Sequence, residues 1–217
     1  DALNLRTANR ELPRGELSLG DAVWLVSAAA LAFVLITTQL GWVCVLLSPV
    51  ALAIVFWYSL AKRFTTYSQL FLGLALAVAP VGGWLAAGGS RGWEPWLLAL
   101  GTGTWVAGFD IFYACQDIEF DRAQGLHSIP ARFGVRRSLS TARWLHCITV
   151  GALAGVALVT PLGVWYLAGV GGVALLLAYE QSLVRVDDLS RVKQAFDLNG
   201  YVGIFYLAST SAAVYVG

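Results

Sequence analysis

The chain has 217 residues, of which 58% are hydrophobic and only 12% are charged. Charged residues make up about a quarter of an ordinary soluble domain, so this composition excludes that class and indicates a membrane protein. The formal net charge is +1, which leaves no whole-chain basic footprint for nucleic acid, and no such partner is expected. The three cysteines lack metal-ligand spacing, so we interpret them as small apolar packing residues.

Seven apolar stretches are long enough to cross a bilayer, which requires roughly 20 residues. Ahead of the first, a Pro/Gly turn signal followed by Ser18 and Asp21 predicts a helix start. We therefore expect an all-α, polytopic membrane bundle with seven transmembrane helices, forming a single domain over 1–217. The stretches cover 21–40, 42–60, 67–89, 93–113, 141–160, 162–184 and 197–216.

Basic residues are concentrated in every second connection between the apolar stretches. Of the fourteen, all except Arg91 lie before the first stretch or after the second, fourth and sixth. Because basic residues favour the cytoplasmic side, this pattern puts Lys62 and Asp117 there and the C-terminus across the membrane. The polar segments 1–20 and 117–140 fall on that same side, and we expect both to be site loops, since long polar connections often bind ligands or act as lids.

Three aspartates follow the fourth apolar stretch, in the sequence DIFYACQDIEFD. Asp117 and Asp121 are four residues apart and Asp110 lies seven before Asp117, so on one continuous helix they share a face with Tyr113. A carboxylate at membrane depth is costly and is by default a functional hypothesis. Since Mg²⁺ commonly takes one or two carboxylates with phosphate oxygens and water, the stripe predicts a Mg²⁺ site holding a phosphorylated ligand. The alternative is carboxylates solvated in the headgroup region or paired with arginine.

Basic residues flank the same side of the membrane. Lys62 and Arg63 follow the second stretch in YSLAKRFT, and Arg6 and Arg10 precede the first. Cations beside a Mg²⁺ site would stabilise a departing diphosphate, although alone they are a topology signal. Aromatic rings lining a cavity could shield a carbocation, and of the two histidines His127 is the one placed to approach a substrate. The aromatic candidates are Tyr58, Trp84 and Trp105.

Three segments of the chain resemble motifs of one family, the UbiA-type intramembrane aromatic prenyltransferases. FDIFYACQDIEFDRAQGLHSIPARFG is similar to the family's second aspartate-rich motif and the loop after it. YSLAKRFT resembles the basic motif after the fourth family helix, and DALNLRTANRELPRG resembles the end of the first aspartate-rich motif with its loop. The three segments occur in the family's order, with its helix spacing between them.

The resemblance implies a nine-helix protein, of which this chain would hold helices three to nine, without the first two. Only Asp1 would then represent the first motif, whose earlier Asn and aspartates are absent. It further implies a Mg²⁺–diphosphate held between Asp1 on one side and the later aspartates on the other. The implied metal ligands are Asp1, Asp110, Asp117 and Asp121, and the implied substrate contacts are Arg6, Asn9, Arg10, Lys62, Arg63 and Tyr113. Tyr58, one of the aromatic candidates, is also expected to contact the substrate.

The expected function is Mg²⁺-dependent transfer of a polyprenyl group from polyprenyl diphosphate to an aromatic acceptor such as 4-hydroxybenzoate, as in quinone biosynthesis. Asp117, Asp121, Lys62 and Arg63 are expected to be catalytic, at a cytoplasmic-side site of a multi-pass protein in the bilayer. Two alternative functions stay open, one enzymatic and one non-enzymatic. One is prenyl transfer to a glycerol-phosphate lipid, and the other is a cation-coupled transporter, for which the expected inverted repeat is not evident.

Overall fold

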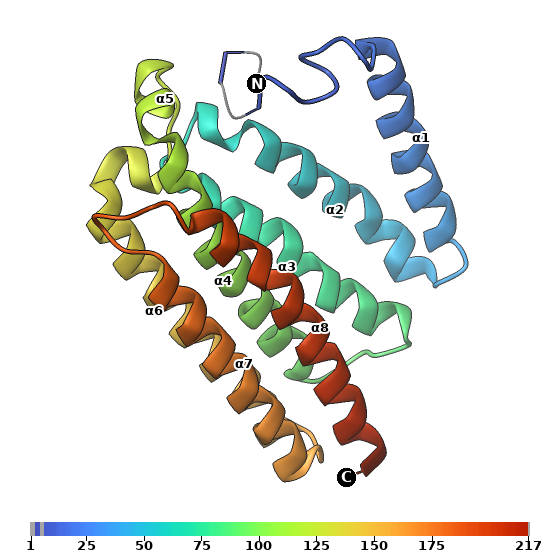
Figure 1. The fold of residues 1–217 in the computed structure, drawn as a ribbon. Helices are drawn as coiled ribbons and strands as arrows, with labels where there is room; N and C mark the ends of the chain where they lie inside the picture. Colours follow the sequence, from blue (N-terminus) through green and yellow to red (C-terminus); the bar gives the residue numbers. More distant parts are fainter. Residues whose placement is uncertain (1–2, 5–6, 217) are drawn as a thin grey trace. The chain divides into compact units, whose positions relative to one another are not determined.

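The computed structural model describes residues 3–4 and 7–216. This part of the chain contains helices and no strand, which confirms the all-α prediction (Figure 1). The α-helices are α1 (Leu19–Thr37), α2 (Trp42–Leu60), α3 (Ser68–Ala86), α4 (Glu94–Ala114), α5 (Ile118–Ala123), α6 (Ile129–Val159), α7 (Gly163–Leu183) and α8 (Val192–Val216). Two short 3₁₀ helices, η1 (Ala61–Arg63) and η2 (Cys115–Asp117), follow α2 and α4.

Seven of these helices are long, and each contains most of one predicted apolar stretch. Six described helices are long and apolar enough to cross a membrane, namely α1, α2, α3, α4, α6 and α7. The remaining long helix, α8, carries polar side chains such as Lys193, Asp197 and Asn199, which lower its hydropathy. The structure therefore supports an integral membrane protein, and the assignment of α8 as a seventh span stays a prediction.

The chain forms two compact units, Asp1–Ala53 and Ile54–Gly217, with the boundary inside α2. In the first unit α1 begins as the sequence predicts, because the Ser18 hydroxyl accepts a 3.1 Å hydrogen bond from the amide of Asp21. Asn9 and Arg10 lie in the turns before this helix and are exposed. Asp1 and Arg6 lie outside the described residues.

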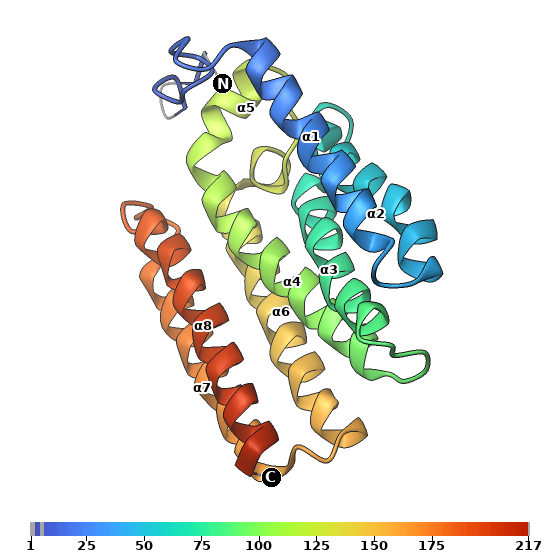
Figure 2. The same ribbon diagram turned by 90° about the vertical axis from the view of Figure 1, so that its right-hand side faces the viewer.

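The second unit is organised around α4, which packs against both α3 and α6, while α7 packs against α8 (Figure 2). Glycine permits the close approach of α3 and α4: a Cβ added to Gly73 would overlap the carbonyl oxygen of Gly103. A cluster of buried residues that includes Ile111, Ala142 and Val192 joins α4, α6 and α8 at one end of this unit. The prediction of a single domain over the whole chain stays a prediction.

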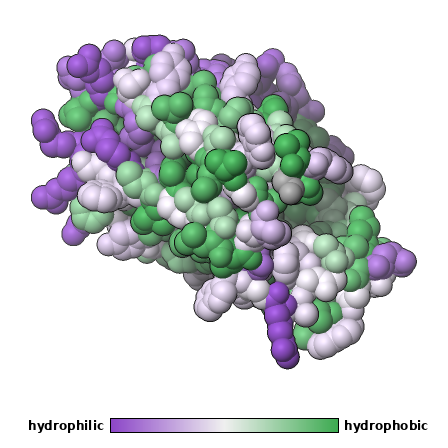
Figure 3. All heavy atoms as spheres, turned by 90° about the horizontal axis from the view of Figure 1, so that it is seen from below, coloured by the Kyte–Doolittle hydropathy of each residue, from purple (hydrophilic) through white to green (hydrophobic). Residues whose placement is uncertain are grey.

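Large apolar side chains cover much of the exterior, as they do on the face seen in Figure 3. Trp24, Leu158, Val164, Leu175 and Ile204 are each more than two-thirds exposed, with Leu158 at 88%. A soluble monomer rarely exposes so much contiguous apolar surface, and this exterior is what a hydrocarbon solvent requires.

The segment 117–140, expected to be a loop, is mostly helical in the structure. Only 124–128 connects α5 to α6, because Ser128 caps α6 and Pro130 occupies its first turn. Gly134, with φ +77° and ψ 169°, then interrupts α6 and re-aims the helix. The many charges of this segment therefore lie mostly on helices, and the expectation of a long loop is wrong.

Candidate active site

The acidic stretch runs through three different elements. Asp110 lies on α4, Asp117 ends η2 and Asp121 lies on α5. The expectation of one uninterrupted α-helix is therefore wrong, because the tighter 3₁₀ turn of η2 lies between Asp110 and Asp121 and changes the angular spacing of the side chains. That the three carboxylates share one face stays a prediction. Asp117 is 5% exposed and Asp121 only 1% exposed, whereas Asp110 is half-buried.

Asp121 is paired with a basic residue 59 positions away in the sequence. The ammonium of Lys62 donates to both carboxylate oxygens of Asp121, at 3.2 Å and 3.1 Å. Ser128 donates from its hydroxyl to the same carboxylate at 2.9 Å. A buried carboxylate is stable only when it is hydrogen-bonded and its charge is balanced, and both conditions are met here. The structure thus brings Lys62 to the acidic stretch, as the sequence analysis expected.

The connection between α5 and α6 is attached to η1 and to the start of α3. The amide of His127 donates to the carbonyl of Lys62 at 2.7 Å, and the amide of Ile129 donates to Oε1 of Gln69 at 3.1 Å. Ser68 donates to the carbonyl of His127 at 3.3 Å. These bonds fix the backbone that carries both members of the Lys62–Asp121 pair. The amide nitrogen of fully buried Gln69 has no hydrogen-bond partner among the described residues.

The aromatic candidates separate into two groups. The ring of Tyr113 lies 4.5 Å from Phe196, which contacts Phe109 at 5.5 Å, and Phe109 contacts Trp105 at 5.7 Å. A continuous aromatic run therefore leads along α4 from the acidic end toward the interior of the unit. Trp84 is not part of it, since its ring packs against Gly89 after the other end of α3.

Two further predicted residues lie close to this end of the unit. Arg63 ends η1, next to Lys62, and its side chain is exposed. Tyr58 is half-buried near the end of α2, within electrostatic range of the Asp110 carboxylate. The Tyr58 hydroxyl and the Lys62 ammonium are thus each linked to a different aspartate of the acidic stretch.

The grouping of possible ligand side chains tests the predicted Mg²⁺ site. Within residues 3–4 and 7–216, the structure gathers no group of three or more acidic, histidine or cysteine side chains that could hold a metal. Both oxygens of Asp121 already accept hydrogen bonds from Lys62. Mg²⁺ commonly takes only one or two carboxylates and completes its shell with phosphate oxygens and water, so a Mg²⁺ site at Asp110 and Asp117 stays a prediction.

A buried polar network that was not predicted from the sequence joins four helices. Trp105 donates from its indole to Asn199 at 2.7 Å, and the Asn199 amide donates to Glu180 at 3.1 Å. Glu180 is fully buried and lies 3.9 Å from His146, whose ring nitrogen pairs with Gln181 at 3.0 Å. A signal was available, because Glu180 is a carboxylate inside the predicted stretch 162–184.

A helical bundle with an apolar exterior and an ion pair between half-buried Lys62 and buried Asp121 at the end of its spans defines an integral membrane protein with a charged site near the membrane boundary. Comparison with known proteins gives the particular family. Residues 1–209 match the UbiA prenyltransferase family, and the chain belongs to it.

Curated relatives carry consistent names. The chain is 32% identical to a 4-hydroxybenzoate octaprenyltransferase of Xanthomonas campestris pv. campestris (strain B100) over 96% of this chain and 69% of that protein. It is 31% identical to a mitochondrial 4-hydroxybenzoate polyprenyltransferase of Aedes aegypti, over 98% of this chain and 48% of that protein. These relatives are transferases, so the family assignment indicates an enzyme.

Solved structures share the fold. An apo structure of a UbiA homologue from Aeropyrum pernix K1 superposes with a TM-score of 0.87 at 35% identity, covering 98% of this chain and 79% of that one. A digeranylgeranylglyceryl phosphate synthase superposes with a TM-score of 0.71 at 18% identity, covering 98% and 76% of the two chains. The second likeness shows the fold alone.

Proposed function

We propose that the protein transfers a polyprenyl group from polyprenyl diphosphate to an aromatic acceptor, with 4-hydroxybenzoate as the first choice. The observation that carries the proposal is the family match over residues 1–209, together with relatives named 4-hydroxybenzoate prenyltransferases at 32% identity. The Lys62–Asp121 pair at a helix end supports it, because it supplies charged groups where a lipid-bound diphosphate would lie.

In this proposal the basic residues bind the diphosphate. Lys62 and Arg63, adjacent on η1, contact its oxygens and stabilise the negative charge that develops as it leaves. Arg6, Asn9 and Arg10 act from the N-terminal segment. Asp110 and Asp117 would hold Mg²⁺ with Asp1 and Asp121 as further ligands, and the ion would supply additional charge neutralisation of the leaving diphosphate. Tyr58, which is within electrostatic range of Asp110, and Tyr113 would contact the substrate.

The bond changes follow from the substrates. The bond between the allylic carbon and the diphosphate oxygen breaks, and its electron pair stays on the diphosphate. The electron-rich ring of the acceptor attacks the allylic carbon, and the ring then loses the proton from the attacked position. Aromatic ring faces stabilise a nearby positive charge, and the aromatic run from Tyr113 to Trp105 would supply them to an allylic cation or cation-like transition state.

The position of the pair at the end of membrane-length helices suits this chemistry. Each CH₂-sized group of the prenyl chain gains about 0.8 kcal/mol on leaving water, so the chain stays in lipid while its diphosphate stays at the aqueous boundary. The distribution of lysine and arginine favours the cytoplasmic side for that boundary.

The test is incubation of the intact protein with labelled prenyl diphosphates, Mg²⁺ and a panel of acceptors that includes 4-hydroxybenzoate and a glycerol-phosphate lipid. We expect a prenylated aromatic product whose formation requires Mg²⁺. Product on the glycerol-phosphate lipid alone would replace the aromatic acceptor by a lipid acceptor. Release of diphosphate with no acceptor product would contradict prenyl transfer.

A further inference from the structure

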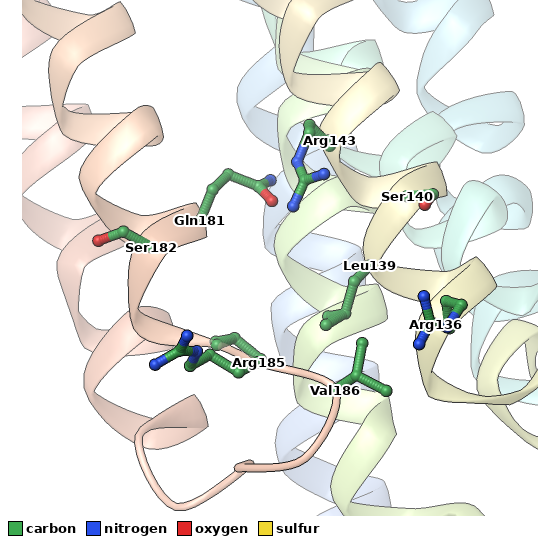
Figure 4. A pocket seen from close by; sticks show the side chains of 9 residues that line it. Arg136, Leu139, Ser140, Arg143, Gln181, Ser182, Arg185 and Val186 are labelled. Atoms are coloured by element: carbon green, nitrogen blue, oxygen red, sulfur yellow. The ribbon is translucent and has the colours of Figure 1, made fainter.

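A basic pocket lies between α6 and the end of α7, away from the Lys62–Asp121 pair (Figure 4). Its volume is about 370 Å³, and it shares no lining residue with the candidate active site. Gln181 and Arg143 point toward one another across the space between the two helices. Its lining includes Arg136, Leu139, Ser140, Arg143, Gln181 and Arg185.

Helical spacing explains why α6 presents these residues together. Arg136 and Arg143 are seven residues apart, with Ser140 between them, so all three share the face that turns toward α7. Leu139, on the same face, belongs to the buried cluster of α4, α6 and α8 and closes the floor of the pocket. The pocket therefore has an apolar floor and a basic, hydroxyl-bearing wall.

The positive charge of the pocket is only partly balanced. Among the described residues, no salt bridge is formed by Arg136, Arg143 or Arg185. Asp188 lies close to Arg185, and the two residues exchange backbone hydrogen bonds of 3.1 Å and 3.2 Å. The carboxylate of Asp188 is held by Ser190, whose backbone and hydroxyl lower its pKa, as does the charge of Arg185. The pocket lining thus contains three guanidinium groups and no carboxylate, and it carries net positive charge.

The surroundings of the pocket are those of a membrane boundary. Arg136 and Ser140 also line a second hollow on the outer side of α6, together with Phe133 and Trp144. Trp144 is 72% exposed, and exposed tryptophan is typical of the level at which lipid head groups meet the hydrocarbon. Beyond it, α6 continues as an apolar span with exposed side chains such as Ile148 and Leu158.

We propose that this pocket binds the phosphate of an anionic phospholipid from the surrounding bilayer. A guanidinium group can bind a phosphate through two parallel N–H···O hydrogen bonds, and Ser140 and Gln181 add neutral donors. Basic pockets between transmembrane helices recognise anionic head groups for this reason. The acyl chains of the lipid would lie along the apolar outer face of α6, beside Trp144. The site is independent of the prenyl acceptor and of the proposed reaction.

The experiment measures lipid binding to the purified, delipidated full-length protein by native mass spectrometry. Phosphatidylglycerol and phosphatidylcholine are titrated separately, and glycerol phosphate is then added as a soluble competitor. We expect about tenfold tighter binding of phosphatidylglycerol, with little displacement by glycerol phosphate. Equal binding of the two lipids would overturn the proposal. Displacement by glycerol phosphate at equal concentration would identify a soluble phosphate ligand and would overturn the lipid assignment.

Two matched double variants locate the site. Arg136→Gln with Arg143→Gln should abolish the preference for phosphatidylglycerol. Arg132→Gln with Arg191→Gln removes the same charge outside the pocket lining and should keep it. Loss of the preference in both variants would mean non-specific attraction, and retention in both would exclude the pocket. If the first double variant fails to fold, Arg143→Lys, which keeps the charge and loses the two-pronged geometry, should weaken the preference, and an unchanged preference would exclude Arg143.

Discussion

Replacing Lys62 by alanine tests the contact on which the candidate site depends. The substitution removes an ammonium that donates to both oxygens of Asp121, a carboxylate that is only 1% exposed. Leaving a buried donor or acceptor without its partner costs about 1–3 kcal/mol, and more when the group is charged and fully buried. The side chain of Lys62 is itself 38% exposed, and Asp121 keeps its hydrogen bond from Ser128, so we expect the lower half of that range, about 1–2 kcal/mol.

The measurement is thermal unfolding in detergent, with a double-mutant cycle as the control. For a chain of this length, 1 kcal/mol corresponds to about 2–4 °C in Tm, so Lys62→Ala should lower the Tm by about 3–6 °C. Asp121→Asn alone should also destabilise the protein. The combination should cost less than the sum of the two by about 1 kcal/mol, because each single change removes the same interaction. Additive effects would show that the ion pair does not form and would refute the geometry of the site.

The same substitution has a functional consequence. If Lys62 also contacts the diphosphate, Lys62→Ala should raise KM for polyprenyl diphosphate more than KM for the acceptor. Equal increases for both substrates would count against that role, whatever the effect on stability.

Three further outcomes are expected. Asp117→Asn should lower prenyl transfer by about 100-fold or more with the Tm nearly unchanged, and retained turnover would remove Asp117 from the proposed metal ligands. Gly73→Ala should destabilise the protein by about 1–3 kcal/mol because its methyl group meets the backbone of α4, whereas Gly82→Ala, with no neighbour within 4 Å, should be tolerated in the same unfolding assay. Cysteines introduced at 38–42 or 160–162 should react with impermeant reagents only from the non-cytoplasmic side, and labelling from the cytoplasm would overturn the topology.

The helices were predictable because a helix that crosses the hydrocarbon of a bilayer requires a long apolar stretch, which hydropathy detects directly. Each of the seven apolar stretches became a helix, and the Ser18 cap marked the start of α1 within a residue. The stretch 141–160 was predicted too short, since α6 begins at Ile129. The first turns of α6 are charged, so a search for apolar stretches does not detect them. Helix formation there depends on the Ser128 cap and on local backbone hydrogen bonds.

The site was predictable in its residue types but not in its geometry. Asp121 and Lys62 were each identified from the sequence, and proximity on one side of the membrane suggested a shared site. Their direct pairing depends on η1 and on the 124–128 connection, which are held together by bonds across about 60 positions of sequence. The break at η2 was equally hidden, because neither proline nor glycine marks it and the spacing of the aspartates suits an unbroken helix.

The Lys62–Asp121 pair also links the two charged ligands of the proposed reaction. If Lys62 left Asp121 for an incoming diphosphate, the buried carboxylate would keep only Ser128, which is unfavourable unless a cation replaces the ammonium. Diphosphate binding by Lys62 and cation binding by Asp121 should therefore reinforce one another, since each ligand supplies the opposite charge that its residue loses when the ion pair separates. Calorimetric titration with polyprenyl diphosphate should accordingly give at least about tenfold weaker binding in EDTA than in Mg²⁺, and should lose most of that difference in Asp121→Asn. Equal affinity with and without the cation would mean that Lys62 stays on Asp121 throughout, as a structural pair only.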